Sequence, residues 1–120
     1  MEEKKILIVD DNISITKSFS RIFRKIGFLT EIALNGNQAI SVIQKNQIDL
    51  VVLDLDMPIK NGFETLLEIK EINPQLPVII VTGQEAKEVR IKVMKAGATN
   101  FFTKPVDFKI LKNIINMLLL

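Results

Sequence analysis

Acidic residues follow two apolar runs of this sequence. The run KILIV leads into Asp10 and Asp11, and the run LVVL leads into Asp54 and, two positions later, Asp56. Carboxylates that come close together repel one another and raise each other's pKa. A hard divalent cation with oxygen ligands relieves this repulsion, so the pattern predicts a site for Mg²⁺ or Mn²⁺.

A hydroxyl and an ammonium group accompany two further apolar runs. Thr82 ends PVIIVT, and Lys104 and Pro105 come after NFFT. A divalent cation and a lysine can hold the oxygens of a phosphoryl group, and a threonine can donate a hydrogen bond to it. A carboxylate can accept that group covalently, since aspartyl phosphates are established intermediates. The residue types therefore indicate phosphoryl transfer.

The composition excludes several other chemistries. The 120 residues include no His and no Cys, which excludes a histidine base, a Ser-His-Asp triad, thiolate metal sites and disulfides. A net charge of +2 gives no reason to expect binding to nucleic acid or to a membrane surface. The N-terminal MEEKKILIVDD lacks the apolar region of a signal peptide, and no segment approaches the ~20 apolar residues of a membrane span. We expect a cytoplasmic protein with one domain, residues 1–120.

Short apolar runs alternate with amphipathic patterns along the whole chain. The expected strands cover residues 5–10, 29–34, 49–54, 77–82 and 100–103. Helical spacing of apolar residues predicts a helix after each strand, around residues 15–26, 39–43, 63–70, 89–96 and 108–118. Strands that are apolar on both faces and joined by helices form a parallel sheet covered on both sides. We therefore expect an α/β fold, a five-stranded doubly wound (βα)5 sheet of flavodoxin-like type with strand order 2-1-3-4-5.

Ligands of such sheets bind beyond the carboxyl ends of the strands. The acidic pair, Asp54, Thr82 and Lys104 would all lie at that edge. Each residue also has a simpler interpretation, because Asp or Thr after a strand commonly forms a turn or caps a helix, and Asn12 or Ser14 could cap the first helix. Capping alone does not place acid, hydroxyl and ammonium groups at the ends of four strands. The combination therefore predicts a site.

The sequence at these places resembles a response-regulator receiver domain, the phosphoacceptor part of two-component signalling. The resemblance covers essentially the whole chain and rests on five motifs taken together, ILIVDDN (6–12), LVVLDLDMP (50–58), KNG (60–62), PVIIVTG (77–83) and KAGATNFFTKP (95–105). It implies a signalling receiver of a phosphorelay rather than a conventional enzyme. Such a receiver takes a phosphoryl group in a Mg²⁺-dependent reaction and loses it slowly by autodephosphorylation.

Carried onto this sequence, the resemblance assigns Asp54 as the phosphoacceptor. Asp10 and Asp11 would hold Mg²⁺, helped by Asp54 and the backbone carbonyl of Asp56. Lys104 would pair first with the Asp54 carboxylate and then with the phosphoryl group. The phosphoryl group would come from a histidine kinase, a phosphotransfer protein or a small phosphodonor.

The resemblance also implies a switch formed by Thr82 and Phe101. Thr82 would hydrogen-bond a phosphoryl oxygen and move toward it, and Phe101 would swing from an exposed to a buried position. Phe lacks the phenolic hydroxyl that many relatives carry here, so the switch would depend on packing alone. The expected readout surface is the helix near 89–96, the strand 100–103 and the helix 108–118, which would contact an effector domain or a partner protein.

Two residues would flank the phosphoryl group and influence its hydrolysis, Asp56 and Gln84. The acidic side chain of Asp56 either repels the phosphoryl dianion or orients the attacking water, and the sequence leaves both open. The peptide bond at Lys104–Pro105 is usually cis in the family. We expect Pro58 to turn the chain away from the site.

Three other interpretations remain open. The stretch DLD resembles the D-x-D motif of haloacid-dehalogenase-type phosphatases, but that motif belongs near the first strand with an acidic pair after it, and here the pair comes first. A receiver fold that acts only by docking would have no Mg²⁺ affinity. A flavodoxin needs a hydroxyl- and glycine-rich loop where this chain has Asp10, Asp11 and Asn12. The apolar end, residues 117–120, suits either the core face of the last helix or a continuation into a linker.

Overall fold

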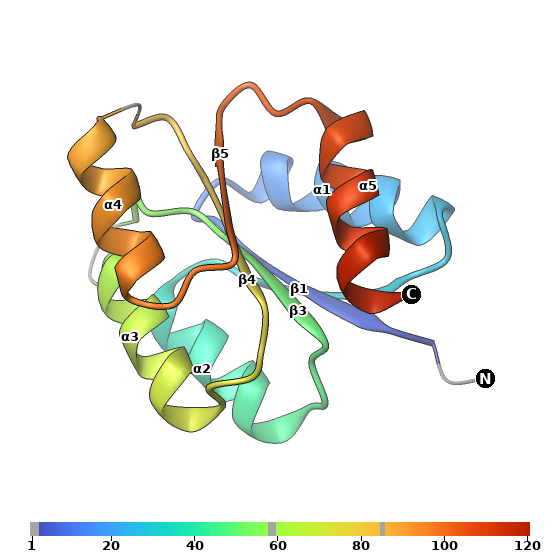
Figure 1. Cartoon of the computed structure of the whole chain (residues 1–120). Helices are drawn as coiled ribbons and strands as arrows, with labels where there is room; N and C mark the ends of the chain where they lie inside the picture. Colours follow the sequence, from blue (N-terminus) through green and yellow to red (C-terminus); the bar gives the residue numbers. More distant parts are fainter. Residues whose placement is uncertain (1–2, 58–59, 85) are drawn as a thin grey trace.

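Five strands alternate with five helices along the chain (Figure 1). The computed structural model describes residues 3–57, 60–84 and 86–120, so Pro58 and its expected turn lie outside the described residues. The strands are β1 (Lys5–Val9), β2 (Leu29–Ala33), β3 (Leu50–Leu53), β4 (Val78–Thr82) and β5 (Asn100–Thr103). The helices are α1 (Ile13–Lys25), α2 (Gly36–Lys45), α3 (Gly62–Ile72), α4 (Lys87–Lys95) and α5 (Phe108–Leu119).

All neighbouring strands of the sheet run parallel, in the order β2-β1-β3-β4-β5. The predicted fold class and strand order are therefore confirmed. The strand that follows β1 in the chain, β2, lies on one side of β1, and the next strand, β3, lies on its other side. The carboxyl ends of β1 and β3 therefore form the topological switch point of the sheet. Doubly wound sheets bind ligands at the carboxyl ends of the strands at this point.

Helices cover both faces of the sheet. Figure 1 shows α1 and α5 on one face and α2, α3 and α4 on the other. Along β1, Ile6 and Ile8 pack into the core beneath α1 and α5, while Leu7 and Val9 pack into the core beneath α2 and α3. Because both faces are buried, every position of such a strand is apolar, and this explains the continuous runs that the sequence shows.

Four of the helices begin with a side chain that accepts hydrogen bonds from the first backbone N–H groups, at Asn12, Asn35, Asn61 and Asp107. Of the two candidates for the first helix, Asn12 is the cap, and α1 starts at Ile13, earlier than the apolar spacing predicts. The helix α4 differs, because Ala86 at its start offers no side-chain hydrogen bond. None of the helices in the described ranges is both long enough and apolar enough to span a bilayer.

Candidate functional site

The strand register places Asp10 beside Asp54. Val9 pairs with Leu53 in the sheet, and each strand ends there, so the next residue of each is an aspartate. The backbone N–H of Asp54 donates to the carbonyl oxygen of Val9 over 2.9 Å, which fixes the two strand ends together. Both carboxylates are almost fully buried, with 4% of Asp10 and 5% of Asp54 exposed.

Three carboxylates form a candidate metal centre. Asp10, Asp11 and Asp54 each offer an oxygen atom, and these oxygens all lie within 4.8 Å of one another. Asp11 is exposed, so the cluster opens to water on one side. A small hard cation such as Mg²⁺ is usually bound through one or two carboxylates and keeps several of its waters, and this cluster, which is open to water, offers such ligands. Mn²⁺ also prefers oxygen ligands, so the same donors suit it.

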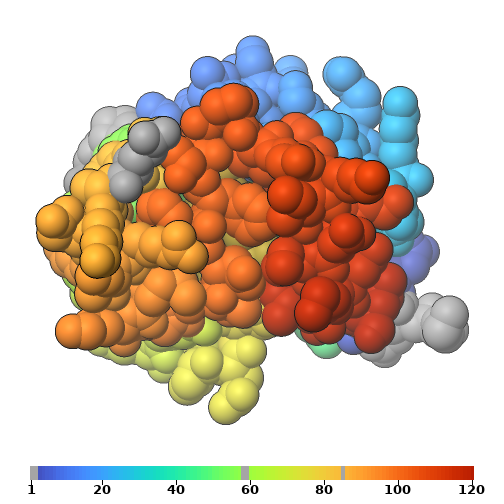
Figure 2. Space-filling view, turned by 45° about the horizontal axis from the view of Figure 1, so that its top comes forward, coloured from blue at the N-terminus to red at the C-terminus, as the bar shows by residue number. Residues whose placement is uncertain are grey.

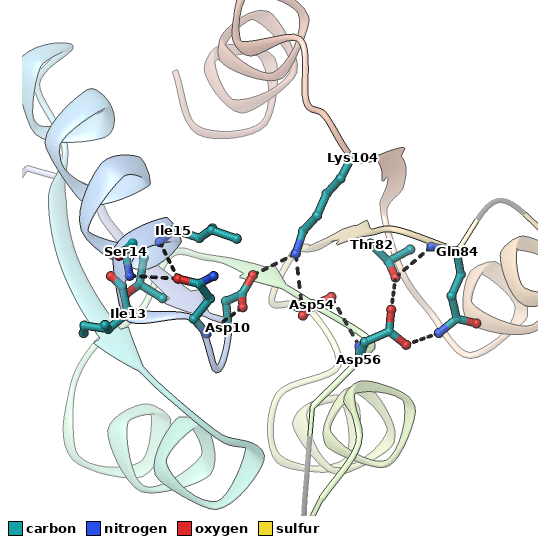
Figure 3. A network of polar contacts seen from close by, with 11 residues as sticks. Asp10, Ile13, Ser14, Ile15, Asp54, Asp56, Thr82, Gln84 and Lys104 are labelled. Atoms are coloured by element: carbon teal, nitrogen blue, oxygen red, sulfur yellow. Dashed lines mark hydrogen bonds and ion pairs between the residues drawn. The ribbon is translucent and has the colours of Figure 1, made fainter.

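Lys104 provides the positive charge at this edge of the sheet. It directly follows β5, and its backbone N–H donates to the carbonyl oxygen of Thr82 over 2.8 Å. Its ammonium nitrogen, Nζ, donates to Asp10 Oδ2 over 2.9 Å and lies 3.7 Å from Asp54 Oδ2 (Figure 3). Although burial alone lowers the pKa of the Lys104 ammonium, its hydrogen bond to Asp10 and the charge of Asp54 raise that pKa above the ordinary value.

The environment of Asp54 disfavours its charge. Burial raises the pKa of the Asp54 carboxyl most, and the nearby charge of Asp10 raises it further. The backbone N–H of Asp56 and the Lys104 ammonium lower it, yet the resulting pKa is about 6, against an ordinary 3.8. At neutral pH most Asp54 side chains are therefore ionised, but at an energetic cost that a cation would relieve.

Thr82 and Gln84 form a second group of polar side chains, which Asp56 connects to the first group, formed by the three carboxylates and Lys104. The Thr82 hydroxyl donates to Asp56 Oδ2 over 3.2 Å, and the side-chain amide of Gln84 donates to Asp56 Oδ1 (Figure 3). The backbone N–H of Asp56 donates to Asp54 Oδ1 over 3.2 Å, and this contact links the two groups. Thr82 is fully buried, and in this state its hydroxyl faces Asp56.

Phe101 lies apart from these polar groups. It is half-buried on β5, packs against the core beneath α2 and α3, and has the Arg90 guanidinium 6.0 Å from its ring centre. Its neighbour Phe102 packs against the opposite core, as the alternation of a strand requires. The Lys104–Pro105 peptide bond is cis, as the resemblance implies.

Asn12, and not Asp10 or Asp11, caps the first helix. Asn12 accepts hydrogen bonds from the backbone of Ser14 and Ile15 at the start of α1. Asp10 Oδ1 in turn accepts the Asn12 N–H over 2.9 Å, which holds this carboxylate in place. Asp10 therefore does not cap α1, but it does form the turn that the simpler interpretation also allowed, and its other oxygen, Oδ2, contacts Lys104.

Gly62 is a positioning residue that the sequence pattern missed. It begins α3, and its N–H donates to the carbonyl oxygen of Leu55 over 3.0 Å. A β-carbon at this position would overlap the carbonyl oxygen of Asp54 and the α-carbon of Leu55. Only glycine lets α3 approach the end of β3 this closely. The resemblance includes Gly62 in the KNG motif without assigning it a role, and nothing in the local sequence shows which distant backbone the glycine meets.

Comparison with known proteins identifies related sequences. Residues 6–116 match the model of a family described as response regulator receiver domain. Sporulation initiation phosphotransferase F of Bacillus subtilis is 35% identical over 115 residues, which cover 96% of this chain and 93% of that protein. The transcriptional regulatory protein ZraR of Klebsiella oxytoca is 37% identical over 107 residues, 89% of this chain. This chain spans only about a quarter of ZraR, since the match covers 24% of its length.

Solved structures share the fold over nearly the whole chain. A CheY-like response regulator receiver domain protein from Methanospirillum hungatei JF-1 superposes with a TM-score of 0.91 at 30% identity, covering 98% of this chain and 94% of that one. The chemotaxis protein CheY4 of Vibrio cholerae superposes with a TM-score of 0.92 at 28% identity, covering 98% and 100%.

Proposed function

The chain belongs to the response regulator receiver domains of two-component signalling, and from this premise we propose that Asp54 is its phosphoacceptor. The observation that carries the proposal is the buried Asp54 carboxylate, which belongs to the cluster of three carboxylates and lies 3.7 Å from the Lys104 ammonium. Residues 1–120 would act together as one receiver domain. A histidine kinase or a phosphotransfer protein would supply the phosphoryl group.

In the proposed reaction an oxygen of Asp54 attacks the phosphorus atom. The new O–P bond forms as the bond between phosphorus and the donor's leaving group breaks, and the leaving group departs with that electron pair. A Mg²⁺ ion held by Asp10, Asp11, Asp54 and the backbone carbonyl of Asp56 would neutralise charge on the transferring oxygens. The ionised form of Asp54 predominates at neutral pH, so the nucleophile needs no separate base.

Lys104 and Thr82 would recognise the product. Lys104 already lies 3.7 Å from Asp54 Oδ2, so a phosphoryl group on Asp54 would meet its ammonium without a large rearrangement. Thr82 would have to turn its hydroxyl from Asp56 toward the phosphoryl oxygens. Both residues would gain contacts only in the phosphorylated state, and such differential contacts are what shift a two-state equilibrium.

The proposed readout surface is formed by α4, β5 and α5. Figure 2 shows α4 in orange and α5 in red on either side of the segment around β5, so that they form one continuous face. Helix α4 exposes the apolar side chains of Ile91 and Met94, which are 44% and 39% exposed. We propose that an effector domain or a partner protein binds here, and that the half-buried Phe101 changes its packing when Thr82 moves.

Phosphorylation by acetyl phosphate with Mg²⁺, followed by intact-mass measurement, tests the proposed function. The wild type should gain one phosphoryl group, and Asp54→Asn should gain none. Asp49→Asn is the matched control, because Asp49 immediately precedes the same strand, at the edge of the sheet opposite Asp54, and its replacement should leave labelling unchanged. Equal labelling of Asp54→Asn and wild type would refute the assignment, and multiple-turnover hydrolysis of a simple phosphomonoester would favour the phosphatase interpretation instead.

A further inference from the structure

The hydroxyl of Thr82 is fully engaged in this structure. It donates to Asp56 Oδ2 over 3.2 Å and accepts from the backbone N–H of Gln84 over 3.3 Å. A hydroxyl group has one proton to donate. The Thr82 proton therefore cannot be given to Asp56 and to an acceptor on Asp54 at the same time, so the two contacts exclude each other.

The Asp56 carboxylate joins two loops of the site. Asp56 lies in the loop that follows β3, while Thr82 and Gln84 lie at the end of β4 and just beyond it. One carboxylate oxygen accepts from Thr82 and the other accepts from the Gln84 side chain (Figure 3). Hydrogen bonds to an ionised acceptor are about twice as strong as those between neutral groups. The carboxylate thus holds the segment that leads into α4 against the loop after β3.

This link matters for α4, because the helix buries few of its own side chains, although the Lys92 ammonium lies 4.0 Å from the centre of the Phe63 ring of α3. The start of α4 has no side-chain cap at Ala86, whereas the other four helices all have one. Val93 is the only fully buried residue of α4. A groove of about 310 Å³ separates α4 from the start of α3, and both Asp56 and Gln84 line it. Room beside the helix and few buried contacts would allow its first turn to shift when Gln84 is released.

We propose that the Asp56 side chain is a latch, a positioning residue that holds Thr82 and Gln84 in the resting state in competition with the phosphoryl group on Asp54. The inference rests on the proposed function and deepens it. The backbone N–H of Asp56 bonds to Asp54 Oδ1, so phosphorylation would bring a dianion close to the Asp56 carboxylate. Repulsion between the phosphoryl dianion and the Asp56 carboxylate would weaken the latch, and the phosphoryl oxygens would at the same time offer the Thr82 hydroxyl a new acceptor.

The latch reduces the apparent affinity for a phosphoryl group, since only the unlatched fraction has the Thr82 hydroxyl available. Loss of one hydrogen bond to a charged acceptor corresponds to a change of about tenfold in such an equilibrium. Asp56→Ala and Gln84→Ala should therefore bind beryllofluoride with Mg²⁺, a mimic of the phosphoryl group, more tightly than the wild type, by up to about tenfold. Gln84→Ala changes no charge, so its effect cannot come from reduced repulsion.

The resting state supplies a test that needs no phosphoryl group. Three-bond couplings to the Thr82 methyl carbon, measured by NMR in unphosphorylated protein, report the Thr82 rotamer. One rotamer is expected in the wild type and in the control Glu71→Ala, which removes an exposed acid of α3. Averaging between rotamers is expected in Asp56→Ala. A single unchanged rotamer in Asp56→Ala would overturn the latch, whatever happens at Asp54.

A double-mutant cycle of Asp56→Ala and Thr82→Val separates the latch from a merely structural contact. The unfolding equilibrium constant should show a coupling of about tenfold in the resting protein and none with beryllofluoride and Mg²⁺ bound. Equal coupling in both states would mean that the contact does not compete with the phosphoryl group, and the latch would be wrong. A resting-state coupling together with rotamer averaging would support the latch even if Asp54 proved unable to accept phosphate, so the two proposals fail separately.

Discussion

Replacing Asp54 by Asn should make the metal-free protein more stable at neutral pH. The buried Asp54 carboxyl has a pKa of about 6, against an ordinary value of 3.8. Each step of one in pKa corresponds to 1.36 kcal/mol, so the ionised side chain costs the folded state about 3 kcal/mol at pH 7. Asn has nearly the same shape without the charge, and Lys104 would keep its 2.9 Å hydrogen bond to Asp10.

The sign of this effect follows from proton linkage. Between pH 4 and pH 6 the folded Asp54 binds more protons than the unfolded chain does, so this group's contribution to stability falls as the pH rises through that range. The advantage of Asp54→Asn should therefore be fully present above about pH 7 and should vanish as the pH falls from 6 toward 4. For a domain of this size, 3 kcal/mol corresponds to a shift in Tm on the order of 10 °C.

Urea denaturation in EDTA at pH 4, 6 and 8 measures this difference, with Asp49→Asn as the control. Asp49 Oδ2 accepts the Lys5 N–H over 2.8 Å, so Asp49→Asn should weaken a hydrogen bond and gain no stability. Saturating Mg²⁺ should stabilise the wild type more than Asp54→Asn, because the cation binds the ionised carboxylates. A loss of stability in Asp54→Asn at pH 8, or a difference that does not change with pH, would refute the reasoning.

Three further changes have outcomes that the site predicts. Asp56→Asn should leave labelling by acetyl phosphate intact but alter the rate of dephosphorylation, which is followed as loss of the phosphorylated mass. If this change abolished labelling without changing Mg²⁺ affinity, the proposal that Asp54 and Asp56 have different roles would be wrong. Gly62→Ala should cost about 1–3 kcal/mol of unfolding free energy, because the new β-carbon would overlap the backbone at the end of β3, and it should also slow phosphorylation. A stable variant with full activity would show that the close approach of α3 to β3 is unnecessary. Asp11→Asn should weaken Mg²⁺ binding, measured by calorimetry, at least tenfold, while the control Glu71→Gln, a surface change on α3, should not weaken it. Equal Mg²⁺ affinities of Asp11→Asn and the wild type would exclude Asp11 as a ligand.

The strand-end pattern carried more information than any single motif. DLD alone fits a phosphatase as well as a receiver. The order of the groups along the chain, with the acidic pair before Asp54 and the lysine after it, favoured the receiver, and the family match over residues 6–116 agrees. Small errors remained at element boundaries. The fourth strand begins at Val78, not Pro77, and Pro has no N–H to donate to the sheet.

The direction of the Asp56 side chain could not be read from the sequence. By spacing, Asp56 belongs with Asp54, and the sequence left open whether its carboxylate faces the dianion or a water. In the structure the carboxylate accepts from Thr82, which lies 26 residues further along the chain. A loop residue has no fixed periodicity, so its direction depends on which partners the neighbouring loop presents.

By itself the sequence determined the strands, the helices and the position of the polar residues at one edge of a sheet, because apolar runs define parallel strands and the carboxyl ends of parallel strands meet at the same edge. It also predicted the chemical class, phosphoryl transfer, because carboxylates, a hydroxyl and an ammonium group follow four of those strands. The tertiary structure alone decided which groups touch. It joined Lys104 to Asp10 across 94 residues, raised the pKa of Asp54 by burial, and required glycine at position 62. These are properties of contacts between elements far apart in the chain, and no local pattern encodes them.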